Sequence, residues 1–233
     1  MLRKIESSQM GNSNLGWLKS KFHFSFAEYY NPKNIHFGVL RVINDDLVKS
    51  RTGFSLHPHE NMEIISYVVD GELTHGDNMG NKNTISRGHV QYMSAGTGVY
   101  HSEFNHGNET LRFLQIWILP DRKGHTPNYG DFRFSPEDRH NKWLHMVSGQ
   151  EGAAPIKIHQ DANVFSLELD ADKEISFPVK EGRQAYLVQI EGSSRINEIE
   201  LTERDGMEII EEGITIKAKE NTHILIVEMK KLY

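Results

Sequence analysis

Short runs of alternating apolar and polar residues fill this chain, and long helical periodicity is missing. Examples are "FGVLRVIND", "MEIISYVVDGEL", "LRFLQIWIL" and "QAYLVQIEG", and most of the gaps contain Gly, Asn, Asp or Pro. This pattern predicts an all-β protein with closely spaced strands. Because exposed sheet edges pair with other chains, we expect the strands to close into a barrel, a jelly roll or a sandwich.

A weak internal repeat narrows this choice to two similar barrels. The segments that begin "ISYVVDGELTHGD" and "YLVQIEGSSRINE" share an order of strand, glycine turn, strand, polar turn and further strands, with Gly71 matching Gly192. Between them, "PDRKGHTPNYGDFRFSPEDRHNK" is rich in Pro, Gly and charge, as a connection would be. We therefore predict a metal-binding barrel in residues 1–130 and a second barrel without metal ligands in residues 131–233.

The composition excludes several classes of protein. With 233 residues, of which 37% are hydrophobic, the chain can form cores that bury a polar site. Its formal charge of −6 disfavours a nucleic-acid or anionic-membrane partner. The absence of cysteine excludes disulfides, thiolate metal sites and a cysteine nucleophile. No apolar run approaches the ~20 residues of a membrane helix, and the first residues do not resemble a signal peptide, so we predict a cytoplasmic protein.

Two pairs of potential metal ligands, each spaced two residues apart, distinguish the first half of the chain. His57 and His59 lie in "HPHENMEIISY", and His101 and Glu103 lie in "HSEF". In a strand, residues i and i+2 share a face, so each pair can project into one barrel interior. Strands ~5 Å apart would bring the four groups within reach of one ion. The matching stretch of the second half is "NTH", so one metal site is expected, in the first half only.

The parity of Glu63 matches that of the two histidines that precede it. If no bulge intervenes, its carboxylate lies on the inner face. There it would not bind the metal itself but would accept a hydrogen bond from the imidazole N–H of a metal ligand and so orient that ligand. The alternative is an outward-facing glutamate after a turn, because a one-residue change of register moves a side chain to the other face.

Three weaker patterns have simpler structural explanations. The alternating Phe22, Phe24 and Phe26 are expected to pack in the core rather than to cover a substrate. His75 and His106 follow turn-like residues and are expected at the surface or at the rim of the site. The "NDD" segment is predicted to be a turn.

Two segments carry a family resemblance. "GFSLHPHENMEIISYVVDGEL" resembles the first cupin motif and "GHVQYMSAGTGVYHSEFN" the second. With "LRVINDD" and "LQIWILPDRKGHTPNY", they resemble pirin and its bacterial quercetinase relatives across residues 15–130. The resemblance implies an all-β fold of two cupin-type (jelly-roll) β-barrels in tandem. It also implies that His57, His59, His101 and Glu103 are the metal ligands.

The resemblance further implies a cofactor and a reaction. The cofactor would be one divalent metal ion, expected to be Fe(II), with Mn, Ni, Co, Cu or Zn as alternatives that the affinity order alone cannot separate. The reaction would be that of a quercetin 2,3-dioxygenase, in which O₂ opens the ring of a small aromatic, flavonol-like substrate and carbon monoxide leaves. Glu103 would be catalytic as well, because it could alternate between ligand and base.

The main alternative is a protein without enzymatic activity. Pirin itself is regarded as an iron-dependent partner of transcription regulators, so a relative could sense metal or redox state and act through a protein partner. An isomerase or another cupin enzyme with the same ligands is a third possibility. The flavonol assay, together with partner binding measured with and without chelator, separates these alternatives.

Overall fold

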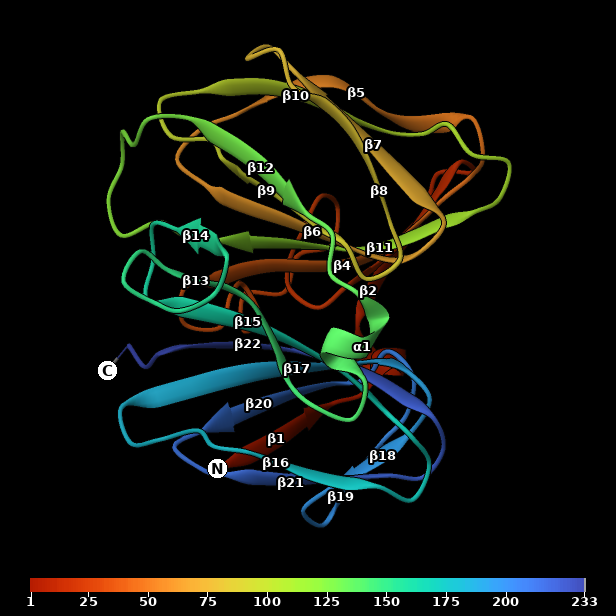
Figure 1. The fold of residues 1–233 in the computed structure, drawn as a ribbon, viewed down its shortest axis with the longest axis vertical. Helices are drawn as coiled ribbons and strands as arrows, with labels where there is room; N and C mark the ends of the chain where they lie inside the picture. Colours follow the sequence, from red (N-terminus) through yellow and green to blue (C-terminus); the bar gives the residue numbers. More distant parts are fainter. Residues whose placement is uncertain (233) are drawn as a thin grey trace.

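The computed structural model describes residues 1–232, so only the last residue of the predicted second barrel lies outside it. The chain forms two barrels, each built from a seven-stranded and a four-stranded sheet, and they stack along the long axis of the molecule (Figure 1). The prediction of an all-β chain with two barrels is confirmed. No helix within residues 1–232 is long and apolar enough to cross a membrane.

The first barrel pairs a large sheet with a small one. In spatial order, the large sheet contains β12 (Asn128–Phe132), β9 (Val90–Ser94), β6 (Glu63–Asp70), β11 (Leu111–Ile118), β4 (Leu40–Val48), β3 (Leu18–Phe22) and β2 (Gly11–Asn14). The small sheet contains β5 (Thr52–His59), β10 (Val99–Asn105), β7 (Glu72–Asp77) and β8 (Lys82–Ser86).

The second barrel repeats this arrangement. Its large sheet contains β1 (Leu2–Ile5), β20 (Gly206–Ile210), β17 (Arg183–Glu191), β22 (Thr222–Lys230), β15 (Ala162–Leu169), β13 (Leu144–Gly149) and β14 (Ile156–Ile158). Its small sheet contains β16 (Glu174–Phe177), β21 (Ile214–Ala218), β18 (Ser194–Ile196) and β19 (Ile199–Leu201). The short helices are η1 (Ser7–Gln9) and α1 (Pro136–Arg139), and α1 lies in the connection between the barrels (Figure 1).

The N-terminal strand belongs to the barrel formed by the C-terminal half. β1 pairs with β20 along its whole length, and Arg3 of β1 forms an ion pair with Glu208 of β20. β12 occupies the corresponding edge of the first barrel, next to β9. A boundary near residue 130 stays a prediction, but these pairings place residues 2–5 in the second barrel and residues 128–132 in the first.

The largest hydrophobic core lies between the two large sheets. It includes Ile43 and Ile65 from the first barrel and Val164 and Val227 from the second. Because side chains alternate along a strand, every second residue of these sheets points instead into a barrel interior. A separate apolar cluster fills the second interior, whereas the first interior holds two smaller clusters and leaves room for polar side chains.

The "NDD" segment is a strand, so its prediction as a turn was wrong. Asn44, Asp45 and Asp46 lie in β4 and are at most 2% exposed. The Asp45 carboxylate accepts hydrogen bonds from Arg112 at 2.7 and 3.0 Å and lies 3.1 Å from the Arg204 guanidinium. Arginine partners compensate the cost of burying a carboxylate, and they lie too far along the chain for a turn pattern to reveal them.

Candidate metal centre

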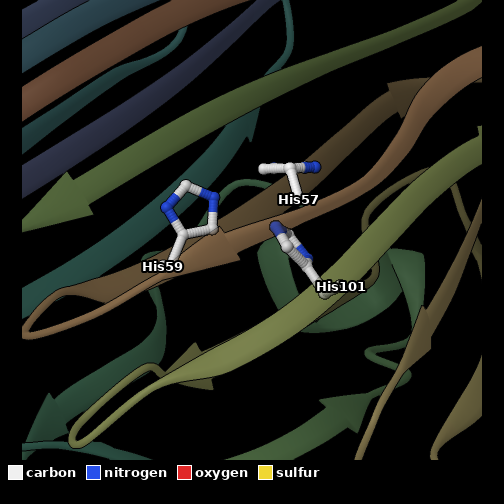
Figure 2. Close-up of side chains that lie close together, drawn as sticks. All are labelled: His57, His59 and His101. Atoms are coloured by element: carbon white, nitrogen blue, oxygen red, sulfur yellow. The ribbon is translucent and has the colours of Figure 1, made fainter.

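Two adjacent strands of the first barrel's small sheet carry the predicted ligands. β5 and β10 run antiparallel, and His101 lies directly opposite His57. His59 follows His57 by two residues, so both imidazoles project from the same face of β5. The three rings point toward one another from these two strands (Figure 2). The structure thus brings three of the four predicted ligands together.

The three imidazoles converge closely enough to share one ion. The ring centroids are 4.5 Å apart for His57 and His101, 4.8 Å for His57 and His59, and 4.9 Å for His59 and His101. One nitrogen of each ring lies within 4.8 Å of the corresponding nitrogens of the other two. Imidazoles this close repel one another when protonated, but as neutral ligands they can bind the same cation.

The surroundings keep the imidazoles of His59 and His101 neutral, as metal ligands must be. Burial, with smaller effects from neighbouring histidines, lowers the pKa of His59 to about 4 and that of His101 to about 3. His101 is 1% exposed, and neither of its ring nitrogens has a hydrogen-bond partner. Nδ1 of His57 donates to the Ser55 carbonyl at 2.7 Å, which leaves Nε2 free. Unpartnered buried nitrogens cost ~1–3 kcal/mol each, and a bound cation would remove that cost, so this donor set fits a divalent metal.

Glu103 lies in the same strand as His101 but is held by other residues. Its carboxylate is 1% exposed; Oε1 accepts hydrogen bonds from Ser66 at 2.7 Å and Gln91 at 2.5 Å, and Oε2 accepts one from Gln115 at 2.9 Å. The register against β5 shifts between His101 and Glu103. Its oxygens are not part of the cluster of ligand atoms that the histidines form. Coordination by Glu103 therefore stays a prediction.

Glu63 points away from the three histidines, which corrects the expectation that it orients one of them from the second shell. Its carboxylate accepts a hydrogen bond from Ser94 at 2.7 Å and lies 3.4 Å from Nδ1 of His159, in the second half of the chain. Ile65, on the same face of β6, packs in the core between the barrels. The expectation assumed that the alternation of β5 continues through residues 60–62. These residues form a turn, so the face on which Glu63 lies does not follow from the positions of His57 and His59.

His75 is buried beside the site, so the prediction that it lies at the surface or at the rim was wrong. It is 1% exposed, its Nε2 lies 2.9 Å from the Asp77 carboxylate, and its ring stacks on Tyr129 at 4.1 Å. Its ring centroid is 5.5 Å from that of His101. The signal that could have found it is the alternation in "GELTHGD", which places this histidine on the face of the preceding leucine. His106 is exposed, as predicted.

A cavity of about 510 Å³ opens onto His57 and His59. Trp117 packs edge-to-face against His59 at 4.9 Å, and Phe26 packs in the same way against Trp117 at 5.4 Å. Aromatic walls around a few polar groups are typical of sites for small planar molecules. The lining residues are Trp17, Phe26, Gly53, Phe54, Ser55, His57, His59, Gln115 and Trp117.

The three alternating phenylalanines do not share one role. Phe22 and Phe24 are buried core residues, as predicted. Phe26 is partly exposed and lines the cavity, so the core prediction was wrong for this residue. β3 ends at Phe22, and the alternation of a strand therefore does not extend to the other two.

The second barrel has counterparts for several positions of the site. β7 and β18 both follow a positive-φ glycine, and His75 and Ile196 each come four residues after that glycine. Glu103 pairs with His75 across β10 and β7, and Ile216 pairs with Ile196 across β21 and β18. Ile216 therefore corresponds to Glu103.

The same register places apolar residues where His57 and His101 would be. Two residues before these positions, His101 pairs with His57, and Ile214 pairs with Phe177. The expected match of "HSE" with "NTH" was wrong. "HSE" lies in β10, whose counterpart is β21, whereas "NTH" leads into β22, the counterpart of β11. Within residues 1–232, the three histidines of the first barrel form the only cluster of three potential ligands.

Comparisons with known proteins cover both barrels. Residues 4–118 match the family described as Pirin, and residues 145–229 match the family described as the quercetinase C-terminal cupin domain. A pirin-like protein of Caulobacter vibrioides is 42% identical over 98% of this chain and 99% of its own length. A quercetin 2,3-dioxygenase of Escherichia coli K12 is 38% identical over 98% of this chain and 99% of its own length.

Solved structures show the same fold. The bacterial pirin YhhW of Escherichia coli, in complex with nickel(II), superposes with a TM-score of 0.92 at 35% identity and full coverage of both chains. A quercetin 2,3-dioxygenase of Acinetobacter baumannii, at 20% identity, superposes with a TM-score of 0.79 over 98% of this chain and 85% of its own. The predicted pair of cupin-type barrels is thereby confirmed.

Proposed function

Because the chain belongs to the pirin family, we propose that it is a metal-dependent dioxygenase of the quercetin 2,3-dioxygenase type. In this reaction O₂ adds across the heterocycle of a flavonol, the ring opens to an aromatic ester that carries a carboxylic acid, and one carbon leaves as carbon monoxide. The observation that carries the proposal is the convergence of three imidazoles, two of which line an aromatic cavity.

The proposed cofactor is one divalent ion held by His57, His59, His101 and Glu103. The three imidazole nitrogens are in place, and Glu103 would complete the set by a side-chain movement from its present hydrogen bonds. Fe(II) is the ion we expect, because imidazoles with one carboxylate suit a non-haem iron that keeps open positions. A bound ion would supply Lewis acidity and positions for substrate and O₂.

The residues around the ion have their own part in the proposed reaction. The flavonol hydroxyl must lose its proton, and Glu103 is the carboxylate at hand to accept it. Gln115 lines the cavity and also donates to Oε2 of Glu103, so it links the substrate space to the proposed base. Gln91 and Ser66 hold the other oxygen and fix the orientation of the carboxylate.

The shape of the cavity supports a planar substrate. Trp17, Phe26, Phe54 and Trp117 provide flat apolar walls, and a volume of about 510 Å³ is within the usual range for small-molecule sites. These walls exclude water from the reacting ring, which strengthens electrostatic interactions inside the site. Edge-to-face contacts such as that of Phe26 with Trp117 fix the walls before substrate arrives.

The test is aerobic turnover of quercetin by protein loaded separately with each candidate metal. We expect loss of flavonol absorbance with release of carbon monoxide, and loss of both signals in His101→Ala. His106→Ala is the matched control, because this exposed histidine lies just beyond the same strand. Fully loaded protein that consumes no flavonol with any metal would overturn the proposal and favour the regulatory alternative.

A further inference from the structure

A second cavity lies in the second barrel, at the place that corresponds to the proposed active site. It has a volume of about 560 Å³, and Phe177, the counterpart of His57, is part of its wall. Glu228 of β22 also lines it, as Trp117 of β11 lines the first cavity. Both cavities therefore open between the large sheet of a barrel and one strand of its small sheet. That strand is β5, which carries His57 and His59, in the first barrel and β16 in the second.

Aromatic side chains form the walls of this second cavity. Trp143 and Phe165 both pack edge-to-face against Phe177, with ring centroids at 4.9 and 5.1 Å. The indole N–H of Trp143 donates to the Ser176 carbonyl at 3.0 Å, and the ring of His145 stacks on that of Phe165 at 4.3 Å. These contacts hold the rings in place, so the site is formed before any ligand binds.

Charged groups at the rim of the second cavity are mostly paired with one another. Arg183 contacts both carboxylate oxygens of Asp161 at 2.8 Å and donates to Glu228. Asn163 donates to the same glutamate at 2.7 Å. Lys180 lines the cavity and is exposed, and no ion pair with it occurs among residues 1–232. The rim therefore offers one ammonium group to an acidic oxygen of a ligand.

We propose that the second barrel binds a planar phenolic molecule against the wall formed by Trp143, Phe165 and Phe177, with an acidic oxygen directed at Lys180, and that this site has no catalytic role. Apolar walls provide the binding energy through burial of the flat ring. With Phe177 and Ile214 in place of His57 and His101, these two positions offer no metal ligand, so the molecule is bound without being converted. The choice of a flavonol as ligand rests on the proposed function, whereas the existence of the site does not.

The positions of the tryptophans allow the two cavities to be observed separately. The chain has three tryptophans; Trp17 and Trp117 line the first cavity and Trp143 lines the second. Full-length protein labelled with fluorotryptophan therefore gives three fluorine NMR signals, which single Trp→Phe variants assign. Quercetin is added to zinc-loaded protein under argon, so that binding is measured without O₂ and without turnover.

We expect the Trp143 signal to shift with its own saturation curve, and equilibrium dialysis to give two quercetin molecules per chain. Phe165→Ser should weaken the binding reported by Trp143 by at least about tenfold, because it removes a ring that the ligand covers. The same variant should leave the curves of Trp17 and Trp117 unchanged. Lys180→Ala should weaken the second site by about two- to fivefold, as for a solvent-exposed ion pair.

A Trp143 signal that stays still while Trp17 and Trp117 saturate would overturn the proposal, and so would a stoichiometry of one in which Trp143 does not respond. Equal weakening at all three signals in Phe165→Ser would also contradict it, because the effect would then be global. These outcomes are separate from the test of catalysis: a protein that binds two flavonols but releases no carbon monoxide would retain the second site and lose the proposed reaction.

Discussion

The two barrels share one topology but fill their interiors in opposite ways. The first places polar groups at its centre, including His101 with two unpartnered ring nitrogens and Glu103 with three donors around it. The second places Ile214 and Ile216 at the corresponding positions, inside a continuous apolar cluster. An apolar interior is stable by itself, whereas unpartnered buried nitrogens favour a bound ion.

This difference indicates a division of labour within one fold. Ile216 and its neighbours bury apolar surface without leaving polar atoms to satisfy, and such an interior can support the partner barrel across the core that the two share. The first barrel buries less apolar surface in its interior, because polar side chains of the proposed ligand set occupy part of that space. The comparison therefore predicts two effects of exchanging residues between corresponding positions: the first barrel loses metal binding, and the second loses the stability of its apolar interior.

The largest effect should come from giving the first barrel the residues of the second. In His57→Phe with His101→Ile, two of the three imidazoles are lost, and metal affinity should fall by far more than the ~100-fold typical of losing a supporting residue. The metal-free protein should remain folded, because the apolar replacements leave no nitrogen unsatisfied. Metal analysis after dialysis, with His106→Phe as the control, measures the loss. Unchanged metal content would show that the ion binds elsewhere.

The reverse exchange should damage the second barrel. Ile216→Glu places a carboxylate in an apolar cluster without donors, and we expect a loss of about 3–5 kcal/mol in the free energy of unfolding from lost packing and unsatisfied polarity. Ile216→Val, which removes one methylene, should cost about 0.5–1.5 kcal/mol. Urea unfolding measures both. A glutamate tolerated as well as valine would mean that the two interiors are less different than their side chains suggest.

The sequence predicted the strands of the barrels and the shared face of His57 and His59 because both depend on local alternation. Alternation with period two is a property of the backbone, so the spacing of His57 and His59 is enough to assign both to one face of a strand. Predictions from alternation were wrong where the chain leaves a strand. Glu63 lies beyond a turn and faces the other barrel, and Phe26 lies beyond the end of its strand and lines the cavity.

Other features depend on contacts between distant residues and are not encoded in any short segment. Asp45 remains in a buried strand because Arg112 and Arg204 reach it from elsewhere in the chain. The donors that surround Glu103 likewise come from β6, β9 and β11, and the spacing within "HSE" does not predict them. The pairing of β1 with the second barrel is a third example of such a long-range contact.

A smaller effect should come from weakening the support of Glu103 rather than any histidine. In Gln91→Leu, Oε1 of Glu103 keeps the Ser66 hydroxyl but loses its amide donor. If Glu103 is the fourth ligand, metal affinity should fall by about 10-fold, toward the low end for residues that orient ligands. Competition with a metal-sensitive dye measures this change, and the exposed Gln150→Leu is the control. Unaltered affinity would argue that Glu103 is not a ligand and serves the reaction alone.

The smallest effect concerns the face between the barrels, where buried polar groups are paired. Burial would raise the pKa of Glu191, but hydrogen bonds from His223 and Arg87 outweigh it and hold that pKa well below its ordinary value of 4.5. A depressed carboxyl pKa stabilises the fold above pH 4.5, and this contribution is lost as the pH falls further. Because the Glu191 side chain is 35% exposed, solvent screening limits the contribution to about 1 kcal/mol.

Glu191→Gln should therefore lower the free energy of unfolding at pH 7 by about that amount and flatten its decline between pH 5 and 3. Urea unfolding across this pH range measures both, and Glu174→Gln, at an exposed position of β16 that forms no ion pair within residues 1–232, should leave the profile unchanged. An unaltered slope in Glu191→Gln would contradict the prediction, because it would show that this carboxylate does not contribute to the pH dependence of stability.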